Sequence, residues 1–362
     1  MASEPEDHEF RSKPAWQRLI VMIGGVTVNF ILGILIFALS LWHYGEQSLP
    51  INKVAEKGGI EATKYGESVG FKTGDNVVAV NGVKAVNYYD LLKPINFIRG
   101  GWNYDVLRDG KTINIAVPDS IRKKVLESKG AVSLFDFRRE AYVGEMTDSS
   151  GAKIAGIEKG DRLVKIDSIE VEYYSEISDA AEQFKGQTIP VLFTREGKEI
   201  SLDVKVNSDG KLGIYPNGLS QFKDDIVTKK FGFIESFPAG YSKGMDDLKV
   251  NIIAFGEMFK GKLNPVKSVS GPIGIAKIFG STWNWQRFWG ITGMLSFILA
   301  FMNLLPIPAL DGGHVLFLLI EMVRRKPLPE KVMYYFQVAG MIILFALMGF
   351  ILFIDFFNAI FN

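Results

Sequence analysis

From Leu19 to Trp42 the chain carries no charged residue. A helix needs about 20 predominantly apolar residues to span a bilayer, so this run predicts a transmembrane helix over residues 19–42. A cleaved signal peptide has a basic start and a shorter apolar core. The acidic start Met1-Ala-Ser-Glu-Pro-Glu-Asp7 and the length of the run therefore argue against a signal peptide.

Two further apolar segments lie near the C-terminus. Residues 288–323 carry only Asp311 and Glu321 as charges, and residues 332–361 carry only Asp355. Lys and Arg concentrate on the cytoplasmic side of membrane spans, and here they flank the spans at Arg11, Lys13, Arg18, Arg324, Arg325, Lys326 and Lys331. If the chain crosses the membrane three times and both basic clusters lie in the cytoplasm, the large middle region and the C-terminus lie outside the cytoplasm. We therefore expect a multi-pass α-helical membrane protein.

The segment 288–323 is interrupted by residues that a membrane helix avoids. It reads Asn303-Leu-Leu-Pro306-Ile-Pro308-Ala-Leu310-Asp311-Gly312-Gly313-His314. A carboxylate at membrane depth is costly and usually faces a partner, a cavity or a metal. Backbone freed by Pro and Gly is tolerated only where protein or a water-filled cavity surrounds it. Asp311 is therefore a candidate functional residue.

The middle of the chain repeats. The segment Gly70-Phe-Lys-Thr-Gly-Asp-Asn-Val-Val-Ala-Val-Asn-Gly82 matches Gly156-Ile-Glu-Lys-Gly-Asp-Arg-Leu-Val-Lys-Ile-Asp-Ser168 at an offset of 86 residues. We pair Tyr88-Tyr89 with Tyr173-Tyr174, and Arg108-Asp-Gly-Lys111 with Arg195-Glu-Gly-Lys198. Each copy is long enough to bury a small core of its own.

Each copy reads as short strands broken by turns. The alternation predicts strands at 76–81, 113–117, 162–167 and 200–206, with a helix after each tyrosine pair. The Arg-Asp-Gly-Lys and Arg-Glu-Gly-Lys stretches are predicted hairpin turns, in which glycine supplies a positive φ.

The Gly-x-x-x-Gly-Asp stretch followed by alternating apolar residues resembles bacterial PDZ domains, although Ser168 replaces the last glycine in the second copy. The resemblance implies two inserted extracytoplasmic PDZ-like domains of mixed α/β structure, which add an extended peptide to a sheet edge. The alternative is that the glycines and aspartates mark turns only, and that the copies gate access sterically.

Residues 208–287 have no clear domain pattern. Their apolar residues at helical spacing predict amphipathic helices, either on the membrane surface or packed against the second repeat. The expected boundaries are an N-terminal segment 1–18, a transmembrane helix 19–42, PDZ-like domains 51–118 and 142–207 with a linker 119–141, a connecting region 208–287, the interrupted span 288–323 and a last span 332–361.

A carboxylate in an enclosed site can ligate zinc, and catalytic zinc takes three protein ligands and a water. The pattern Asn303-x-x-Pro306-x-Pro308-x-Leu310-Asp311-Gly312 resembles the signature of the site-2 protease family of intramembrane zinc metalloproteases. Gly24-Gly25-Val26-Thr27-Val28-Asn29-Phe30 is similar to the second membrane helix of its bacterial members, where Ala-Gly-Pro is usual and Val26 departs from the pattern. The tandem PDZ-like copies and Gly271-Pro272-Ile273 resemble the regulator-of-sigma-E type.

The resemblance implies regulated intramembrane proteolysis in a bacterial inner membrane. Its substrates would be membrane-anchored proteins such as anti-sigma factors, already trimmed by another protease. Asp311 would ligate zinc, Asn303, Pro306 and Pro308 would bind substrate, and the PDZ-like pair would filter substrates by size. Leu310, Gly312 and Asn29 support the motif.

The composition excludes two kinds of site. With 41 basic and 40 acidic residues, nothing suggests a nucleic-acid partner, and the lack of cysteine excludes thiolate ligands.

One family feature is absent from the 362 residues, namely His-Glu-x-x-His, which supplies two imidazole ligands and the glutamate base. His8-Glu9 begins like it, but Ser12 stands where the second histidine belongs. We expect His314 to be structural and His43 interfacial. The chain is thus predicted to be incomplete as a protease, with no identifiable general base. The alternative is a membrane-anchored PDZ protein that captures substrates without cutting them. A transporter is disfavoured, because the spans show no internal repeat.

Overall fold

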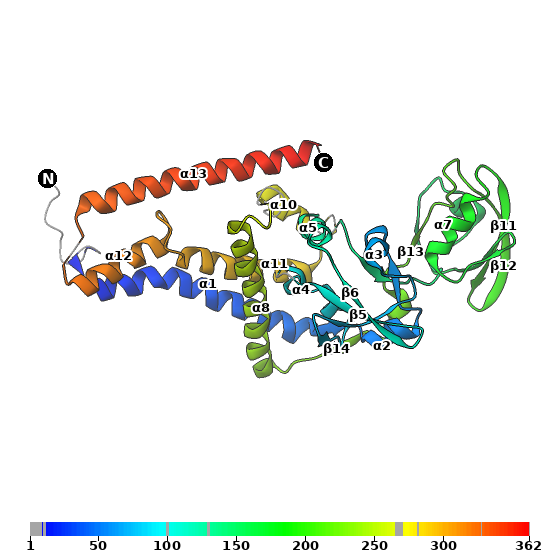
Figure 1. Cartoon of the computed structure of the whole chain (residues 1–362), viewed down its shortest axis with the longest axis horizontal. Coiled ribbons are helices and arrows are strands. Elements are labelled where there is room, and N and C mark those ends of the chain that lie inside the picture. The colour runs from blue at the N-terminus through cyan, green and yellow to red at the C-terminus, as the bar shows by residue number, and fades with distance from the viewer. Residues whose placement is uncertain are drawn as a thin grey trace. The chain divides into compact units, whose positions relative to one another are not determined.

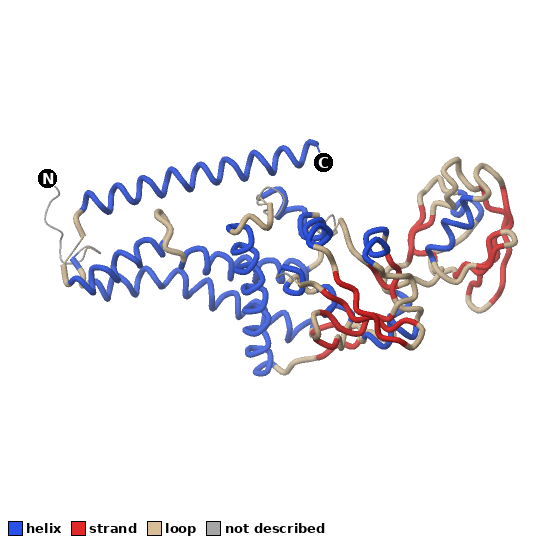
Figure 2. The backbone as a smooth tube through the Cα atoms, in the orientation of Figure 1, coloured by secondary structure: helices blue, strands red, loops and turns tan. Residues whose placement is uncertain are grey.

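The computed structural model describes residues 9, 12–98, 101–128, 131–264, 271–280, 282–326 and 328–361. The chain divides into two compact units. Residues 1–46 with 229–362 form the helical unit, and residues 47–228 form the strand-rich unit. Figure 2 distinguishes their helices and strands by colour.

The helical unit contains the apolar helices expected from the sequence. Its elements are α1 (Ala15–Tyr44), α8 (Phe233–Phe259), α10 (Pro272–Ile278), α11 (Trp285–Leu304), α12 (Asp311–Arg324) and α13 (Glu330–Phe361). Three stretches are long and apolar enough to cross a membrane, namely Ala15–Tyr44, Trp285–Leu304 and Lys331–Phe356. These features are those of a membrane protein that also carries β domains.

One phenylalanine joins three helices of this unit. Phe297 of α11 is 1% exposed, and its ring occupies space left by two glycines. A Cβ at Gly33 of α1 would lie 2.7 Å from the ring, and a Cβ at Gly244 of α8 would lie 2.2 Å from it. Glycine at these two positions therefore lets α1 and α8 approach α11 closely.

The helix α8 crosses α1 (Figure 1). Four of its five buried residues recur at every fourth position, at Ser236, Gly240, Gly244 and Leu248. A Cβ at Gly240 would lie 2.6 Å from the backbone nitrogen of Ala38. This buried face of the region 208–287 thus packs on α1 and α11, two of the helices that are apolar enough to cross a membrane. Its placement on a membrane surface stays a prediction.

The strand-rich unit contains two β domains of the same design. The first has a sheet in the order β4-β3-β5-β6, and a pair β2-β7. The second has a sheet in the order β10-β9-β11-β12, and a pair β13-β8. Their cores are separate, one spanning residues 49–137 together with Phe222 and the other spanning residues 141–214. We call these the first and second β domains.

The elements of the strand-rich unit alternate strands with short helices. Those of the first β domain are α2 (Ile51–Glu56), β2 (Ile60–Ala62), α3 (Lys64–Val69), β3 (Asn76–Val80), β4 (Val83–Lys84), η2 (Tyr88–Leu92), α4 (Ile95–Ile98), β5 (Asn103–Arg108), β6 (Lys111–Ala116), α5 (Asp119–Glu127) and β7 (Phe135–Phe137). Those of the second are β8 (Val143–Met146), α6 (Gly151–Ala155), β9 (Arg162–Ile166), β10 (Ile169–Glu170), α7 (Tyr174–Glu182), β11 (Thr188–Arg195), β12 (Lys198–Lys205) and β13 (Ile214–Pro216). The strands β1 (Glu46–Ser48) and β14 (Val227–Lys229) pair with each other, and η3 covers Ser220–Phe222.

The four predicted strands and both hairpins are confirmed. In the turns, Asp109 and Gly110 have φ of 50° and 73°, and Glu196 and Gly197 have φ of 49° and 79°. In the first domain the short helix η2 begins at Tyr88 and α4 follows it, whereas in the second domain the longer α7 begins at Tyr174. Residues 119–141, for which we predicted a linker, contain α5 and β7.

The tyrosine pairing was wrong by one residue. The helix η2 begins at Tyr88 after its N-cap Asn87, and α7 begins at Tyr174 after its N-cap Tyr173. The offset of 86 therefore continues through the helix start, so that Tyr88 corresponds to Tyr174. The sequence comparison alone does not show at which residue each helix begins, so it could not fix this register.

A buried ion pair recurs in both domains. Asp75 is 1% exposed and accepts from Arg108 Nε at 2.6 Å and Nη2 at 2.7 Å. Asp161 is 2% exposed and accepts from the same two nitrogens of Arg195, both at 2.8 Å. Each arginine thus ties the end of a hairpin to the Gly-Asp turn, and such bidentate pairs are geometrically specific.

Candidate functional site

The break between α11 and α12 lies where the sequence predicts it. The helix α11 ends at Leu304, residues 305–310 leave the helical path, and α12 begins at Asp311. Pro306 and Pro308 have no N–H to donate. Ala309 has φ of 71°, a left-handed conformation that is uncommon without glycine. The proline-rich segment is therefore an irregular connection between two helices.

Glycines hold this connection against the start of α12. A Cβ at Gly312 would lie 2.2 Å from the Leu305 carbonyl oxygen, and one at Gly313 would lie 2.6 Å from that of Ile307. The helix α13 closes on the same connection, because a Cβ at Gly340 would meet Pro308 at 2.0 Å. Backbone atoms cannot rotate away as side chains do, so these three positions need glycine to keep the arrangement.

Asp311 lies beside Gly25 of α1. A Cβ at Gly25 would lie 3.6 Å from Asp311 Oδ2, so the carboxylate lies beside the backbone of the Gly24-Gly25 motif. In the described part of the chain, no hydrogen bond or ion pair involves this carboxylate. Two motifs nearly 300 residues apart in the sequence are thus brought together, as a shared site requires.

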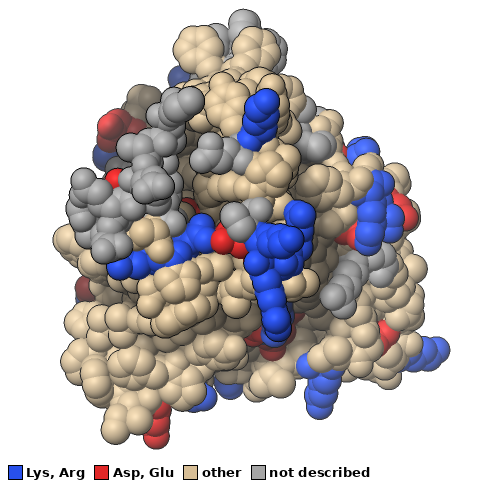
Figure 3. Space-filling view, turned by 90° about the vertical axis from the view of Figure 1, so that its left-hand side faces the viewer, with Lys and Arg blue, Asp and Glu red and all other residues tan. Residues whose placement is uncertain are grey.

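Two polar contacts fix α1 beside α11 and α12. Ser296 Oγ donates to the Asn29 carbonyl oxygen at 2.7 Å, so the backbone of Asn29 joins α1 to α11. Arg18 Nη2 lies 2.5 Å from Glu321 Oε1, with side chains that are 16% and 19% exposed. This ion pair joins α1 to α12 beyond Asp311. Figure 3 views the end where α1 begins and α12 ends, and Lys and Arg side chains gather on it.

The predicted substrate-binding residues surround the break. Asn303 lies in the last turn of α11 and is partly exposed, and Pro306 is exposed. Pro308 and Leu310 are partly buried, and Gly312 is buried. The structure thus brings Asn303, the two prolines and Asp311 to one connection. Their roles toward a substrate stay predictions.

The described residues do not form a zinc site by themselves. Across those ranges, no group of three His, Cys, Asp or Glu side chains is placed to hold a metal. His314 Nε2 lies 3.4 Å from Gln337 Nε2 of α13, and the His43 ring stacks edge-on against Tyr44 at 4.6 Å. His8 lies outside the described residues. Asp311 therefore fits zinc as a single donor.

The role of Asp355 was not found from the sequence. It is 7% exposed and accepts from the backbone nitrogens of Ile273 at 2.5 Å and Gly274 at 3.1 Å. A Cβ at Gly271 would lie 2.9 Å from its Oδ2. The carboxylate thus ties α13 to the start of α10. The signal was present in the sequence, since a lone charge in an apolar run needs a partner.

Comparison with known proteins gives consistent matches. Residues 1–347 match the sequence profile of peptidase family M50. "Regulator of sigma E protease" of Haemophilus influenzae is 27% identical and "Regulator of sigma-E protease RseP" of Escherichia coli is 25% identical, each over 98% of this chain and 81% of the relative. "Putative zinc metalloprotease" of Vibrio cholerae is 25% identical over the same shares.

Proposed function

Because the chain belongs to peptidase family M50, the site-2 proteases, we propose that it takes part in zinc-dependent intramembrane proteolysis. The observation that carries the proposal is the position of Asp311. It begins a helix in an apolar segment, lies beside Gly25 of a membrane helix, and forms no ion pair with any described residue. A carboxylate kept in that setting without a partner suits a metal ligand.

The metal, when bound, would supply a Lewis acid and an activated water. Asp311 would contribute one ligand, and the others would come from outside the described residues. The chain's own residues hold Asp311 in place, through the glycines of α12 and the Arg18–Glu321 pair. Asn303 and the irregular connection 305–310 would bind an extended segment of substrate, because an interrupted helix leaves backbone groups free to pair.

The two β domains would be PDZ-like and lie outside the cytoplasm of a bacterial inner membrane. The basic residues at the ends of α1 and α12 support this orientation. The substrates would be membrane-anchored proteins such as anti-sigma factors, trimmed beforehand by another protease. The β domains would select among them, by binding peptide or by restricting access.

The test uses the chain completed by a fused membrane helix that carries His-Glu-x-x-His, and it compares this wild-type form with its Asp311→Ala variant in membranes that contain an epitope-tagged, single-span reporter. We expect the wild type to cleave the reporter, and Asp311→Ala to insert normally without cleaving it. Glu321→Gln is the matched control, since it removes a carboxylate from the same helix without touching Asp311. Cleavage by Asp311→Ala at the wild-type rate would refute the role of Asp311.

The same experiment separates the alternative function. If the wild type co-purifies with the reporter and leaves it intact, and Asp311→Ala behaves identically, the chain is a membrane-anchored substrate-binding protein. Zinc content measured on the purified variants gives a second readout. Asp311→Ala should lower it and Glu321→Gln should not.

A further inference from the structure

Exposed positive charge gathers at one end of the helical unit. The helix α1 begins there, α12 ends there at Arg324, and α13 begins shortly afterwards at Glu330. Figure 3 shows Lys and Arg side chains on this end. The exposed cations that the structure describes on these helix ends are Lys13, Arg324, Arg325, Lys326 and Lys331, and we call them the basic cluster.

Protein carboxylates do not neutralise the basic cluster. Glu321, near the end of α12, is already paired with Arg18 of α1. Both side chains of that pair are largely buried, at 19% and 16% exposed. Within the described ranges, no ion pair involves a member of the basic cluster. Its five positive charges therefore lack a counter-charge from the part of the chain that the structure describes.

The basic cluster lies where apolar helices begin. The helix α1 carries no charge from Leu19 to its Trp42, and the membrane-length stretch of α13 starts at Lys331. Trp16 is 52% exposed, and Tyr334 and Tyr335 are 63% and 69% exposed. Exposed Trp and Tyr on membrane helices gather at the level of the lipid headgroups. The cations beside these rings therefore lie at the level of lipid phosphates.

Arg325 occupies a backbone position that favours glycine. It is the C-cap of α12, with φ of 53° and ψ of 25°, and this left-handed conformation is strained for a residue with a Cβ. The helix dipole favours a cation near this end, but Arg324 in the last turn already supplies one. The local fold therefore does not call for arginine here, and its charge indicates a role outside the fold.

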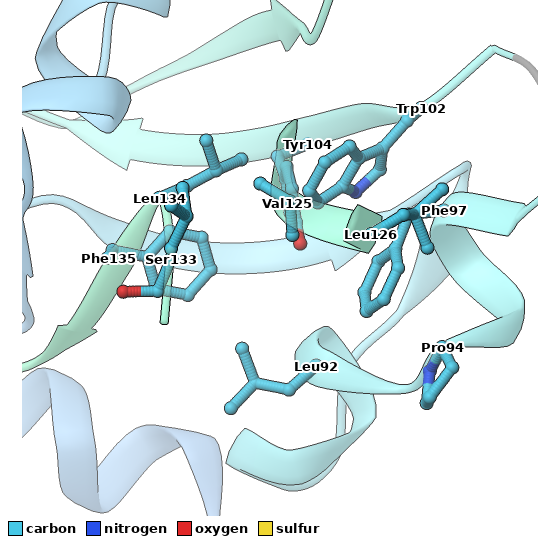
Figure 4. A pocket seen from close by; sticks show the side chains of 11 residues that line it. Leu92, Pro94, Phe97, Trp102, Tyr104, Val125, Leu126, Ser133, Leu134 and Phe135 are labelled. Carbon is cyan, nitrogen blue, oxygen red and sulfur yellow. The ribbon is translucent and has the colours of Figure 1, made fainter. Parts of the chain in front are cut away.

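The hollow in the first β domain suits a different ligand. Figure 4 shows apolar side chains around it, among them Leu92, Phe97 and Phe135, and none of its lining residues is charged. A phosphate moved there would lose water without gaining a counter-charge, which is costly. The strand-rich unit can therefore supply control substitutions for a test of anion binding.

We infer that the basic cluster binds the phosphate groups of anionic phospholipids in the membrane around the helical unit. Each Lys or Arg near a bilayer surface adds to the attraction for anionic lipid, and the exposed rings of Trp16, Tyr334 and Tyr335 lie beside the lipid at headgroup level. The inference goes beyond the proposed function, because it requires neither zinc nor cleavage.

The test uses the purified chain in an uncharged detergent, with bound lipid counted by native mass spectrometry during titration. The probes are phosphatidylglycerol and phosphatidylcholine with identical acyl chains. We expect phosphatidylglycerol to bind at least about tenfold more tightly than phosphatidylcholine. Equal affinity for the two lipids would overturn the inference. Inorganic phosphate at the same concentration should leave phosphatidylglycerol bound, and its displacement would overturn the assignment to a lipid.

Arg325→Gly removes one charge without a cost to the fold. Glycine adopts the left-handed conformation freely, so the unfolding temperature in the uncharged detergent should stay the same or rise. Phosphatidylglycerol affinity should fall about fivefold. Arg325→Lys keeps the charge and should bind within about twofold of the wild type. Unchanged affinity of Arg325→Gly, or equal loss in both variants, would overturn the role of this charge.

A charge-matched pair of triple variants tests the cluster as a whole. Arg324→Gln, Arg325→Gly and Lys326→Gln combined should weaken phosphatidylglycerol binding by about a hundredfold. The control removes three charges from exposed lysines of the strand-rich unit and should leave binding unchanged; it combines Lys84→Gln, Lys159→Gln and Lys198→Gln. Equal effects of the two triple variants would mean that net charge, and not the basic cluster, attracts the lipid, which would overturn the inference.

Asp311→Ala separates lipid binding from the proposed function. Asp311 begins α12, and 14 helical residues place it about 21 Å from the cluster at the other end. We expect this variant to bind phosphatidylglycerol like the wild type. If it does so while reporter cleavage survives, only the role of Asp311 fails. If cleavage depends on Asp311 and the wild type does not prefer phosphatidylglycerol, only the lipid site fails.

Discussion

Replacing Gly312 with alanine tests how tightly the connection 305–310 fixes Asp311. The new Cβ would lie 2.2 Å from Leu305 O and 2.6 Å from Leu304 O, whereas real Cβ atoms essentially never approach closer than 3.0 Å. The start of α12 must therefore move by roughly 0.8 Å or more. Both neighbours are backbone carbonyls, so no rotamer change relieves the overlap.

The expected cost follows from this overlap. Overpacking of this kind costs about 1–3 kcal/mol, and the better helix propensity of alanine returns up to about 1 kcal/mol. We expect the free energy of unfolding to fall by about 1–2 kcal/mol. Asp311 precedes Gly312 directly, and a 1 Å misplacement can cost on the order of 10²-fold in rate. Expressed as a free energy, the loss in the rate of reporter cleavage should therefore exceed the loss in the free energy of unfolding.

Thermal unfolding of the purified chain in detergent, followed by tryptophan fluorescence, measures the stability change. The matched control is Gly290→Ala, because Gly290 lies inside α11 and a Cβ there meets nothing within 4 Å. It should unfold at the wild-type temperature or slightly above, since alanine in a helix interior gains about 0.5–1 kcal/mol over glycine. If Gly312→Ala is as stable and as active as Gly290→Ala, the backbone contact does not constrain Asp311 and the reasoning fails.

Three further changes test other contacts. Asn303→Ala should slow reporter cleavage while the purified protein keeps its zinc content, and an equal loss of both would remove Asn303 from substrate binding. Arg108→Ala leaves Asp75 buried with the Lys72 backbone N–H as its remaining donor. Denaturant unfolding should therefore show that the free energy of unfolding falls by an amount near the lower end of about 3–5 kcal/mol. An unchanged unfolding midpoint would contradict the importance of the ion pair. Asp355→Ala removes the acceptor of Ile273 N and Gly274 N, so the rate of hydrogen exchange at these two amides should rise. An unchanged exchange rate would mean that α13 does not hold α10.

The repeat and its strands could be predicted because they depend on local patterns. Alternation over a few residues places a strand, and an Asp-Gly or Glu-Gly pair places a hairpin turn. The function of the repeated aspartate was missed, because Asp75 was interpreted as a turn marker. Its partner Arg108 is 33 residues away. The recurrence of Asp161 and Arg195 at matching positions was the available signal for the pair.

The candidate site could be predicted only as separate motifs. The sequence identified Asp311 as a charge that needs an explanation, and it identified the Gly24-Gly25 stretch by resemblance. Their proximity depends on the packing of α1 against α12, which no local pattern encodes. A difference between the β domains was equally hidden, since the Tyr174 hydroxyl donates to the Ile214 carbonyl oxygen whereas the Tyr88 hydroxyl bonds to the Asp136 side chain.

Phe222 gives the strand-rich unit an unusual order of assembly. It is fully buried in the first β domain and packs edge-on against Phe137 at 5.2 Å, yet it follows the last strand of the second β domain in the sequence. Domains generally form from the N-terminus onward during synthesis. Here the ribosome releases every residue of the second core, which ends at Ile214, before it releases the residue that completes the first. The second β domain can therefore mature while the first still waits for its final side chain, and a chain interrupted between the two events would expose the unfinished first core to proteases.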